Sequence, residues 1–203
     1  MLADFGDTLV DETFMWRNCE EFPDWTDHWG RVIGPMASDW NRGVVTSEQV
    51  CASMAASLGC SAQETARYVD VLCRDLRFFP MINAALARRR ARGERQAIVT
   101  VNPDLFGRLV ERYRLADAFD TIVTSCEVGT EDKTAVCLRA CEELGVDPPA
   151  TVLVDNIEAN VTGWRAAGGL GYLFAGDDAF AADVRRGAVP GFVAADARAD
   201  VAG

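Results

Sequence analysis

The sequence predicts an α/β protein with a Rossmann-like parallel sheet at its core and an inserted α-helical unit. Short runs rich in Val, Ile and Leu recur along the 203 residues and stay apolar at successive positions. Such runs are typical of strands in a parallel sheet that helices cover on both faces. Helical patterns separate the later runs, which is the alternation of a doubly wound sheet.

The strands and helices of the core follow from the apolar runs and from helix-boundary residues. Asn102 is expected to cap a helix that starts at Pro103, and Gly145 and Gly168 lie where helices should end. The last ten or so residues are expected to fray. The expected strands cover residues 2–3, 97–101, 121–123, 151–154 and, with a less apolar pattern, 171–174.

The inserted helical unit is expected at residues 13–79, which leaves residues 1–12 and 80–203 as the α/β core. Thr46 with Gln49 and Ser61 with Glu64 fit the capping box, in which side chains satisfy the free amides of a first helical turn. Aromatic residues crowd the insertion and are expected to form its core rather than a cage for a substrate. They are Phe14, Trp16, Phe22, Trp25, Trp29 and Trp40.

Charge and composition argue against several classes of protein. A formal net charge of −11 disfavours nucleic acid and anionic membranes as partners, and the arginine-rich segment 88–92 is expected to be a solvated helix face. No apolar run reaches the roughly 18 residues of a membrane helix, and the N-terminus lacks a signal-peptide pattern, so we expect a cytoplasmic protein. The seven cysteines form no CxxC pair and are expected to be buried thiols, without disulfides or zinc. The oligomeric state stays open.

Two acidic residues directly follow expected strands, Asp4 after the first and Asp155 after the run 151–154. Taken alone, each is also typical of a turn or a helix cap. In an open parallel sheet the carboxyl ends of the strands line the ligand crevice, so we expect both carboxylates at one edge. They would repel each other without a cation between them, and Mg²⁺ prefers such oxygen ligands.

Three other residues near strand or helix ends are candidates for binding an anion. Thr100 could donate a hydrogen bond, although a β-branched residue is ordinary in a strand. For Asn102 the helix-cap interpretation is favoured, and contact with a substrate stays open. Lys133 is the single lysine beside 19 arginines, and it lies at a helix start, where its charge opposes the helix dipole. A compact ammonium can sit between an aspartate and a phosphate.

Taken in order, these residues resemble the motifs of the haloacid dehalogenase (HAD) superfamily. Residues 4–8, Asp-Phe-Gly-Asp-Thr, resemble the family's DxDGT motif after its first strand. Thr100 matches its Ser/Thr, Lys133 its lysine, and residues 155–156, Asp-Asn, its acidic pair. The insertion 13–79 lies where the family inserts a helical cap, so the resemblance spans the whole chain.

The resemblance implies a Mg²⁺-dependent phosphatase that acts on a small phosphorylated metabolite. Asp4 would attack phosphorus and form an aspartyl-phosphate that water hydrolyses. Mg²⁺ would be held by the carboxylates of Asp4 and Asp155 and by the backbone carbonyl of Gly6. Lys133 and Thr100 would contact the phosphoryl oxygens, and closure of the cap would exclude water.

Two positions depart from the family pattern and leave alternatives open. Gly6 stands where phosphatases of the family usually carry an aspartate as general acid and base, and Asp7 next to it is a conceivable substitute. Asn156 stands where a second carboxylate is common. The alternative is therefore a catalytically degenerate protein that binds a ligand without turnover. Phosphonate cleavage would need a lysine in the cap, and the family's dehalogenases usually carry a tyrosine at the position of Gly6.

Overall fold

A five-stranded parallel sheet forms the centre of the molecule. The computed structural model describes residues 1–13, 22–74 and 76–197, and its sheet has the strand order β5-β4-β1-β6-β7. The central strand therefore pairs with β4 on one side and β6 on the other, and all four pairings are parallel. The five strands fall on the five predicted runs: β1 (Leu2–Ala3), β4 (Ala97–Thr100), β5 (Thr121–Thr124), β6 (Val152–Asp155) and β7 (Leu170–Leu173).

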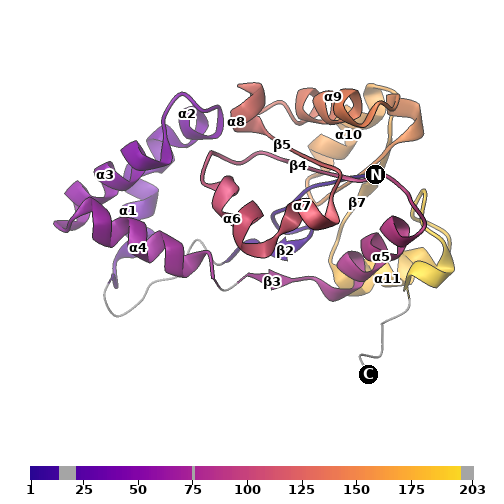
Figure 1. Ribbon diagram of the computed structural model, residues 1–203, viewed down its shortest axis with the longest axis horizontal. Coiled ribbons are helices and arrows are strands. Elements are labelled where there is room, and N and C mark those ends of the chain that lie inside the picture. Colours follow the sequence, from indigo (N-terminus) through magenta and orange to yellow (C-terminus); the bar gives the residue numbers. More distant parts are fainter. Residues whose placement is uncertain (14–21, 75, 198–203) are drawn as a thin grey trace.

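Helices cover both faces of this sheet, as the apolar runs predict (Figure 1). Along β1, Leu2 packs with helices α9 (Lys133–Leu144) and α10 (Glu158–Ala166). Its neighbour Ala3 belongs to the core on the opposite face, with helices α5 (Pro80–Ala91) and α11 (Asp177–Arg185). Successive residues of a strand point to opposite faces, so an apolar residue is needed at each position.

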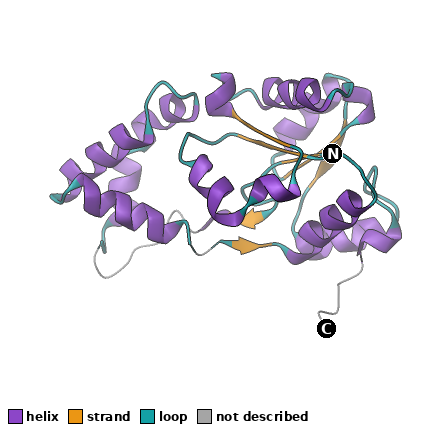
Figure 2. Ribbon diagram, in the orientation of Figure 1, coloured by secondary structure: helices purple, strands orange, loops and turns teal. Residues whose placement is uncertain are grey.

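The inserted segment forms a group of helices beside the sheet, at the left of Figure 1 and in purple in Figure 2. Both predicted capping boxes are confirmed, at the starts of α3 and α4. Two short antiparallel strands, β2 (Val10–Asp11) and β3 (Arg77–Phe78), pair where the chain leaves the core and returns. The helices are α1 (Trp25–Val32), α2 (Ala37–Asn41), α3 (Ser47–Leu58) and α4 (Ala62–Leu72), with a 3-10 turn at Gly34–Met36.

Aromatic rings form much of the core of this helical group, as predicted. The Trp25 ring lies 4.6 Å from that of Tyr68 and 5.8 Å from that of Trp29, and Trp25 is fully buried. Trp29 also approaches Trp40, with 6.1 Å between the ring centroids. The predicted core residues Phe14 and Trp16 lie outside the described residues.

The helix predicted to start at Pro103 begins three residues later, so the prediction of Asn102 as its N-cap was wrong. Helix α6 (Phe106–Tyr113) has Leu105 at its N-cap position, without a side-chain hydrogen bond. The side chain of Asn102 instead donates to Thr100. The remaining short helices are α7 (Leu115–Ala118), α8 (Ser125–Val128), and the 3-10 turns η3 (Pro148–Ala150) and η4 (Ala194–Ala197).

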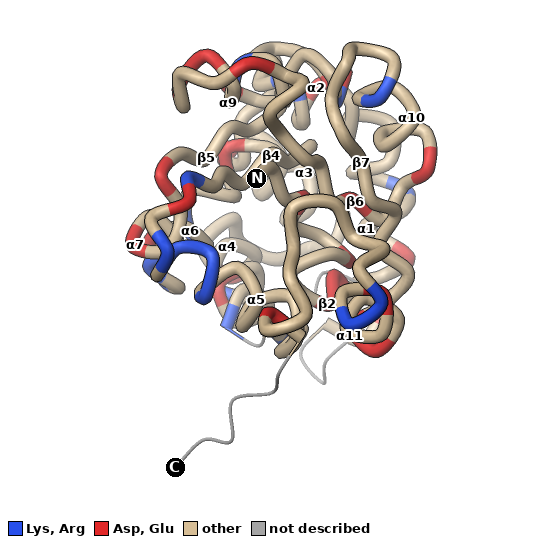
Figure 3. The backbone as a smooth tube through the Cα atoms, turned by 90° about the vertical axis from the view of Figure 1, so that its right-hand side faces the viewer, with Lys and Arg blue, Asp and Glu red and all other residues tan. Residues whose placement is uncertain are grey.

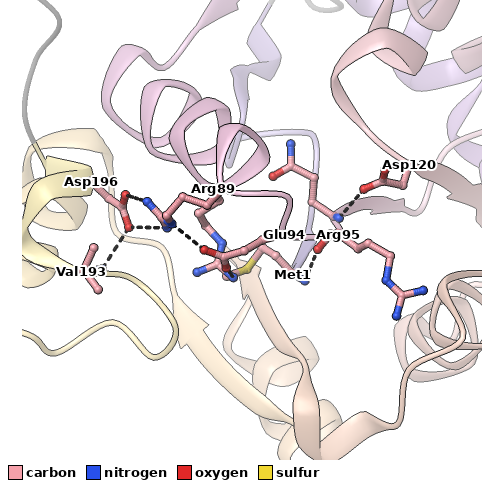
Figure 4. Close-up of polar contacts among 9 residues, drawn as sticks. Met1, Arg89, Glu94, Arg95, Asp120, Val193 and Asp196 are labelled. Atoms are coloured by element: carbon pink, nitrogen blue, oxygen red, sulfur yellow. Dashed lines mark hydrogen bonds and ion pairs between the residues drawn. The ribbon is translucent and has the colours of Figure 1, made fainter.

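The arginine-rich segment at the end of α5 is a solvated face only in part, which corrects the sequence-based expectation. Arg89 is buried and pairs with Glu94, and Arg92 donates to both oxygens of Asp196 at 2.7 and 3.2 Å. The fully buried Asp196 also accepts from the Val193 amide (Figure 4). Turn η4 is therefore held against α5. The expectation that the last residues fray is wrong for residues 194–197, and residues 198–203 lie outside the described part.

The surface of the described residues carries charges of both signs. Lys and Arg positions are dispersed among acidic ones over the elements in Figure 3. Each of the six cysteines in the described ranges is a free thiol. Within those ranges, none of the helices combines the length and the apolar character that a membrane crossing requires.

Candidate active site

The register of the sheet brings Asp4 and Asp155 to the same edge. Ala3 pairs with Val154, so the next residue of each strand lies at the carboxyl end of β1 and β6. The Asp4 amide donates to the Val154 carbonyl at 2.9 Å, which fixes the backbone at this point. Both side chains are buried. Two acidic groups thus meet where an open parallel sheet holds its ligands.

Lys133 lies between these two carboxylates. It is the first residue of α9, and its Nζ is 2.5 Å from Asp4 Oδ1 and 3.2 Å from Asp155 Oδ2. Only 4% of Lys133 is exposed. Burial alone would lower the pKa of Lys133, but Asp4 and Asp155 outweigh it and raise that pKa above its usual value. The lysine therefore stays charged. Its two carboxylate partners explain why a positive charge is tolerated at the start of α9, where the helix dipole disfavours it.

Burial raises the pKa of Asp4 to about 6, and repulsion from Asp155 adds to the shift while Lys133 opposes it. A carboxylate that is desolvated and held by a single ammonium is a good nucleophile or metal ligand, because water does not stabilise its charge.

Asp155 is held more rigidly than Asp4. Its Oδ1 accepts the amide of Ile157 at 2.8 Å, and the Asn160 side chain donates to both carboxylate oxygens at 3.1 Å. The next residue, Asn156, lies with its Oδ1 3.5 Å from the Thr8 hydroxyl. Asn160 therefore orients the Asp155 carboxylate.

Thr100 and Asn102 complete the polar side of the site. Thr100 ends β4, next to β1, and is buried. The Asn102 side chain donates to Thr100 Oγ1 at 2.7 Å, which leaves the threonine hydrogen free to bond an anion. The sequence-predicted residues Asp4, Thr100 and Lys133 thus lie together, and Asn102 lies with them.

These residues line a cavity of about 110 Å³. The atoms at this edge that could bind a metal are oxygens, which suit Mg²⁺ rather than a softer metal. Among the described residues no three His, Cys, Asp or Glu side chains gather as a metal site. Mg²⁺ commonly uses one or two carboxylates and completes its shell with water and phosphate, so two aspartates and a carbonyl fit it. The lining residues are Asp4, Gly6, Glu12, Thr100, Val101, Asn102, Lys133, Asn156, Ile157 and Asn160.

Asp7, the conceivable substitute for a missing acid at position 6, faces away from this cavity. The chain turns tightly after Phe5, whose carbonyl accepts the amides of Leu9 and Val10. Asp7 takes a left-handed conformation in that turn, with φ 50°, and is exposed. Its Oδ1 accepts the amide of Glu12 at 3.0 Å.

Glu12 is the functional candidate that sequence reasoning missed. A Cβ built on Gly6 would lie 2.6 Å from the carboxyl carbon of Glu12 and 2.6 Å from its Oε2. Burial raises the pKa of Glu12 to about 7, with further contributions from Asp4 and then Asp7. Glu12 lies eight positions after Asp4, at the end of the predicted core segment 1–12, and only the turn after Phe5 brings it back over Gly6.

A second, mostly apolar cavity of about 200 Å³ adjoins the first. Glu12, Val101 and Asn102 line both cavities. The wall on the far side comes from the helical group and from α6. Its apolar members include Trp29, Ile33, Trp40, Leu105, Phe106 and Leu109.

Polar contacts hold the helical group against the core beside these cavities. Asp104, in the turn after β4, accepts the amide of Ser47 at 3.1 Å, the Ser47 hydroxyl, and Trp40 Nε1 at 3.1 Å. Burial alone would raise the pKa of Asp104, but these hydrogen bonds outweigh burial and lower that pKa below its usual value. A second contact joins Glu131 to Ser38 at 2.6 Å. The apolar cavity is therefore closed on one side by helices that the core binds through hydrogen bonds.

The strand order, the inserted helices and the carboxylate–lysine site together define an α/β architecture with a polar site at the carboxyl edge of the sheet. The chain has the fold of HAD family hydrolases, as solved structures show. A HAD family enzyme of Bacteroides thetaiotaomicron, in complex with magnesium and inorganic phosphate, superposes with a TM-score of 0.63 at 16% identity, over 85% of this chain and 91% of that chain.

Two other solved structures are also similar to this chain in fold. L-2-haloacid dehalogenase of Xanthobacter autotrophicus, with chloropropionic acid covalently bound, gives a TM-score of 0.61 at 18% identity, over 92% of this chain and 81% of that chain. A predicted HAD-like family hydrolase of Porphyromonas gingivalis gives 0.61 at 16% identity, over 85% and 88%. No protein-family model and no curated protein matches the sequence.

Proposed function

We propose that the protein is a Mg²⁺-dependent phosphatase that acts on a small phosphorylated metabolite through an aspartyl-phosphate on Asp4. The observation that carries the proposal is the buried arrangement of Asp4, Lys133 and Asp155, with Nζ of the lysine 2.5 and 3.2 Å from the two carboxylates. The Bacteroides enzyme of the same fold, bound to magnesium and inorganic phosphate, supports it.

Asp4 and Asp155, with the backbone carbonyl of Gly6, are the residues that would hold Mg²⁺. When bound, the ion neutralises the charge of the phosphoryl oxygens. Asn160 and the Ile157 amide keep Asp155 in one orientation, which a ligand of a metal requires.

The protein residues supply the nucleophile and bind the phosphoryl group. A carboxylate oxygen of Asp4 attacks phosphorus as the ester bond to the leaving group breaks, and water later releases phosphate from Asp4. The Lys133 ammonium and the Thr100 hydroxyl stabilise the negative oxygens of the transition state from fixed positions. Helices α1–α4 would act as a cap, with residues 1–12 and 80–203 as the catalytic core and 13–79 as the cap domain, and would exclude water during the first step.

Phosphate release tests this function. Wild-type protein with Mg²⁺ should hydrolyse at least one ester in a panel of small phosphate monoesters, and EDTA should abolish the activity. Asp4→Asn should lower kcat by 10³-fold or more, because the amide is no nucleophile, on the order of what loss of a covalent nucleophile costs. Folded wild-type protein that releases no phosphate in Mg²⁺ would contradict the proposal.

Glycine at position 6, which has no carboxyl group, supports a second candidate function: binding of a phosphorylated ligand without turnover. Calorimetric binding of a panel ester to an inactive wild type would identify it. The same panel should include 2-chloropropionate in EDTA with halide detection, because a haloacid dehalogenase shares the fold. Halide release without metal would replace the phosphatase proposal.

A further inference from the structure

We propose that Glu12 protonates the leaving group, and so provides the acid–base carboxyl that position 6 lacks. This inference rests on the proposed phosphatase function. Three geometric observations carry it: the space that Glu12 fills, its place between the two cavities, and the freedom of its carboxyl group.

The Glu12 carboxyl occupies the space that a side chain at position 6 would take. A Cβ on Gly6 would lie within 2.6–2.8 Å of all three atoms of that carboxyl group. Real Cβ contacts essentially never come below 3.0 Å. The inward position of the Glu12 carboxyl therefore depends on glycine at position 6, and it supplies a carboxyl group next to the site from a different position of the chain.

Glu12 stands at the border between the polar and the apolar cavity. The nucleophile Asp4, with Thr100 and Lys133, lines the polar cavity alone, whereas Trp29 and Phe106 line the apolar cavity alone. A phosphoryl group in the first cavity places the organic part of the ester in the second. The bridging oxygen between them then lies at the border, where Glu12 is one of three described residues that line both cavities.

The carboxyl group of Glu12 is free to exchange a proton with a ligand. Its backbone is fixed, because the amide donates to Asp7 Oδ1 at 3.0 Å. Yet no residue in the described part of the chain donates a hydrogen bond to its carboxylate. Glu12 is half-buried and lines both cavities, so its carboxyl oxygens are open to a ligand in either one.

The proton balance of both steps is complete. As the bond from Asp4 to phosphorus forms, the ester bond breaks, and the Glu12 proton moves to the leaving oxygen to give a neutral alcohol. In the second step the Glu12 carboxylate takes a proton from water as the water oxygen attacks phosphorus. The bond to Asp4 then breaks, phosphate leaves, and Glu12 is protonated again.

Variation of the leaving group tests the inference. Phenyl and p-nitrophenyl phosphate place a ring in the apolar cavity, but phenolate, with a conjugate acid pKa of about 10, needs a proton far more than p-nitrophenolate does. Glu12→Gln should lower kcat/KM for phenyl phosphate by about 10²–10⁴-fold, the usual contribution of a general acid. The loss for p-nitrophenyl phosphate should be much smaller. Equal losses on both esters would overturn the proposal, because a structural role does not depend on the leaving group.

Matched variants exclude indirect causes. Glu48→Gln, an exposed glutamate at the start of α3, should change neither rate. Glu12→Ala should lose activity on phenyl phosphate, and the double variant Gly6→Asp with Glu12→Ala should regain it, because the new carboxyl enters the emptied space. A folded double variant that is no better than Glu12→Ala contradicts the inference. Wild type that releases phosphate from neither ester, nor from any other, overturns the phosphatase function itself.

Discussion

Lys133 illustrates why one residue type is required at one position. Arginine takes every other basic position in the chain, yet a compact ammonium lies 2.5 and 3.2 Å from two carboxylates at Lys133. A planar guanidinium is larger and donates in a fixed fork, so it does not fit between them in the same way. The charge of this lysine is what allows two aspartates to be buried side by side.

Lys133→Met should therefore destabilise the metal-free protein. Its removal leaves two buried carboxylates without a counter-charge, which costs roughly 3–5 kcal/mol of unfolding free energy. Urea denaturation in EDTA measures the change, and Mg²⁺ should recover part of it. Asp4→Asn serves as the control, since it removes one of the repelling charges and leaves Lys133 paired with Asp155. A Lys133→Met protein as stable as wild type would show that the lysine does not balance these charges.

At the scale of elements, Asp104 connects the core to the helical group. Its carboxylate lies after β4, yet it accepts the amide and hydroxyl of Ser47 at the start of α3 and the indole N–H of Trp40 in α2. An acid at a helix N-terminus also interacts favourably with the helix dipole. One side chain therefore helps to position the wall of the apolar cavity.

Asp104→Ala should loosen the contact between helices α1–α4 and the sheet. Hydrogen bonds to a charged group contribute about 1.5–3 kcal/mol, so the Trp40 indole and the first turn of α3 should exchange their hydrogens faster. NMR-detected hydrogen exchange reports both sites. Asp39→Ala, which removes an exposed ion pair with Arg42, is the matched control. Unchanged protection in Asp104→Ala would mean that apolar packing alone holds the helices in place.

The sequence predicted the elements well where a local pattern of residues determines them. Every strand of the parallel sheet was visible because both faces of that sheet are covered, and Asp4, Thr100 and Asp155 were visible because they lie at the ends of its strands. The short pair β2 and β3 was not predicted. The helix after β4 was misplaced because Asn102 bonds Thr100 instead of a helical amide. Glu12 was missed because its position depends on a turn that folds it over Gly6, and no periodic pattern records such a turn.

At the scale of the whole molecule, the end of the described chain is bound to the middle of the fold. Arg92, after α5, reaches the buried Asp196, and Arg88 donates to the Asp196 carbonyl. Arg89 lies 4.9 Å from the centroid of the Phe192 ring. No sequence pattern predicts this contact, because its partners are 104 residues apart and the arginines resemble a surface cluster.

Asp196→Asn should destabilise the protein at neutral pH and less so in acid. Burial opposes ionisation of Asp196, but the hydrogen bond from Arg92 prevails and lowers the pKa of Asp196. Because the folded-state pKa is lowered, the ion pair with Arg92 stabilises the fold fully at pH values above the unfolded-state pKa of about 4. This stabilisation is lost as the pH falls through the folded-state pKa. Thermal melts of wild type and variant should differ most near pH 7 and converge as the pH falls below the folded-state pKa of Asp196. A difference independent of pH would assign the effect to packing.

The central position of β1 has a consequence for how the protein is made. Leu2 and Ala3 are synthesised before their partners in the sheet, which are Ala97 and Ile98 on one side and Leu153 and Val154 on the other. Closing such long loops costs chain entropy before any contact compensates for it, so these pairings form late. Asp4 therefore meets Lys133 only after the 129 positions that separate the two residues have been synthesised. A nascent chain thus carries Asp4 long before it carries the ammonium group that balances its charge.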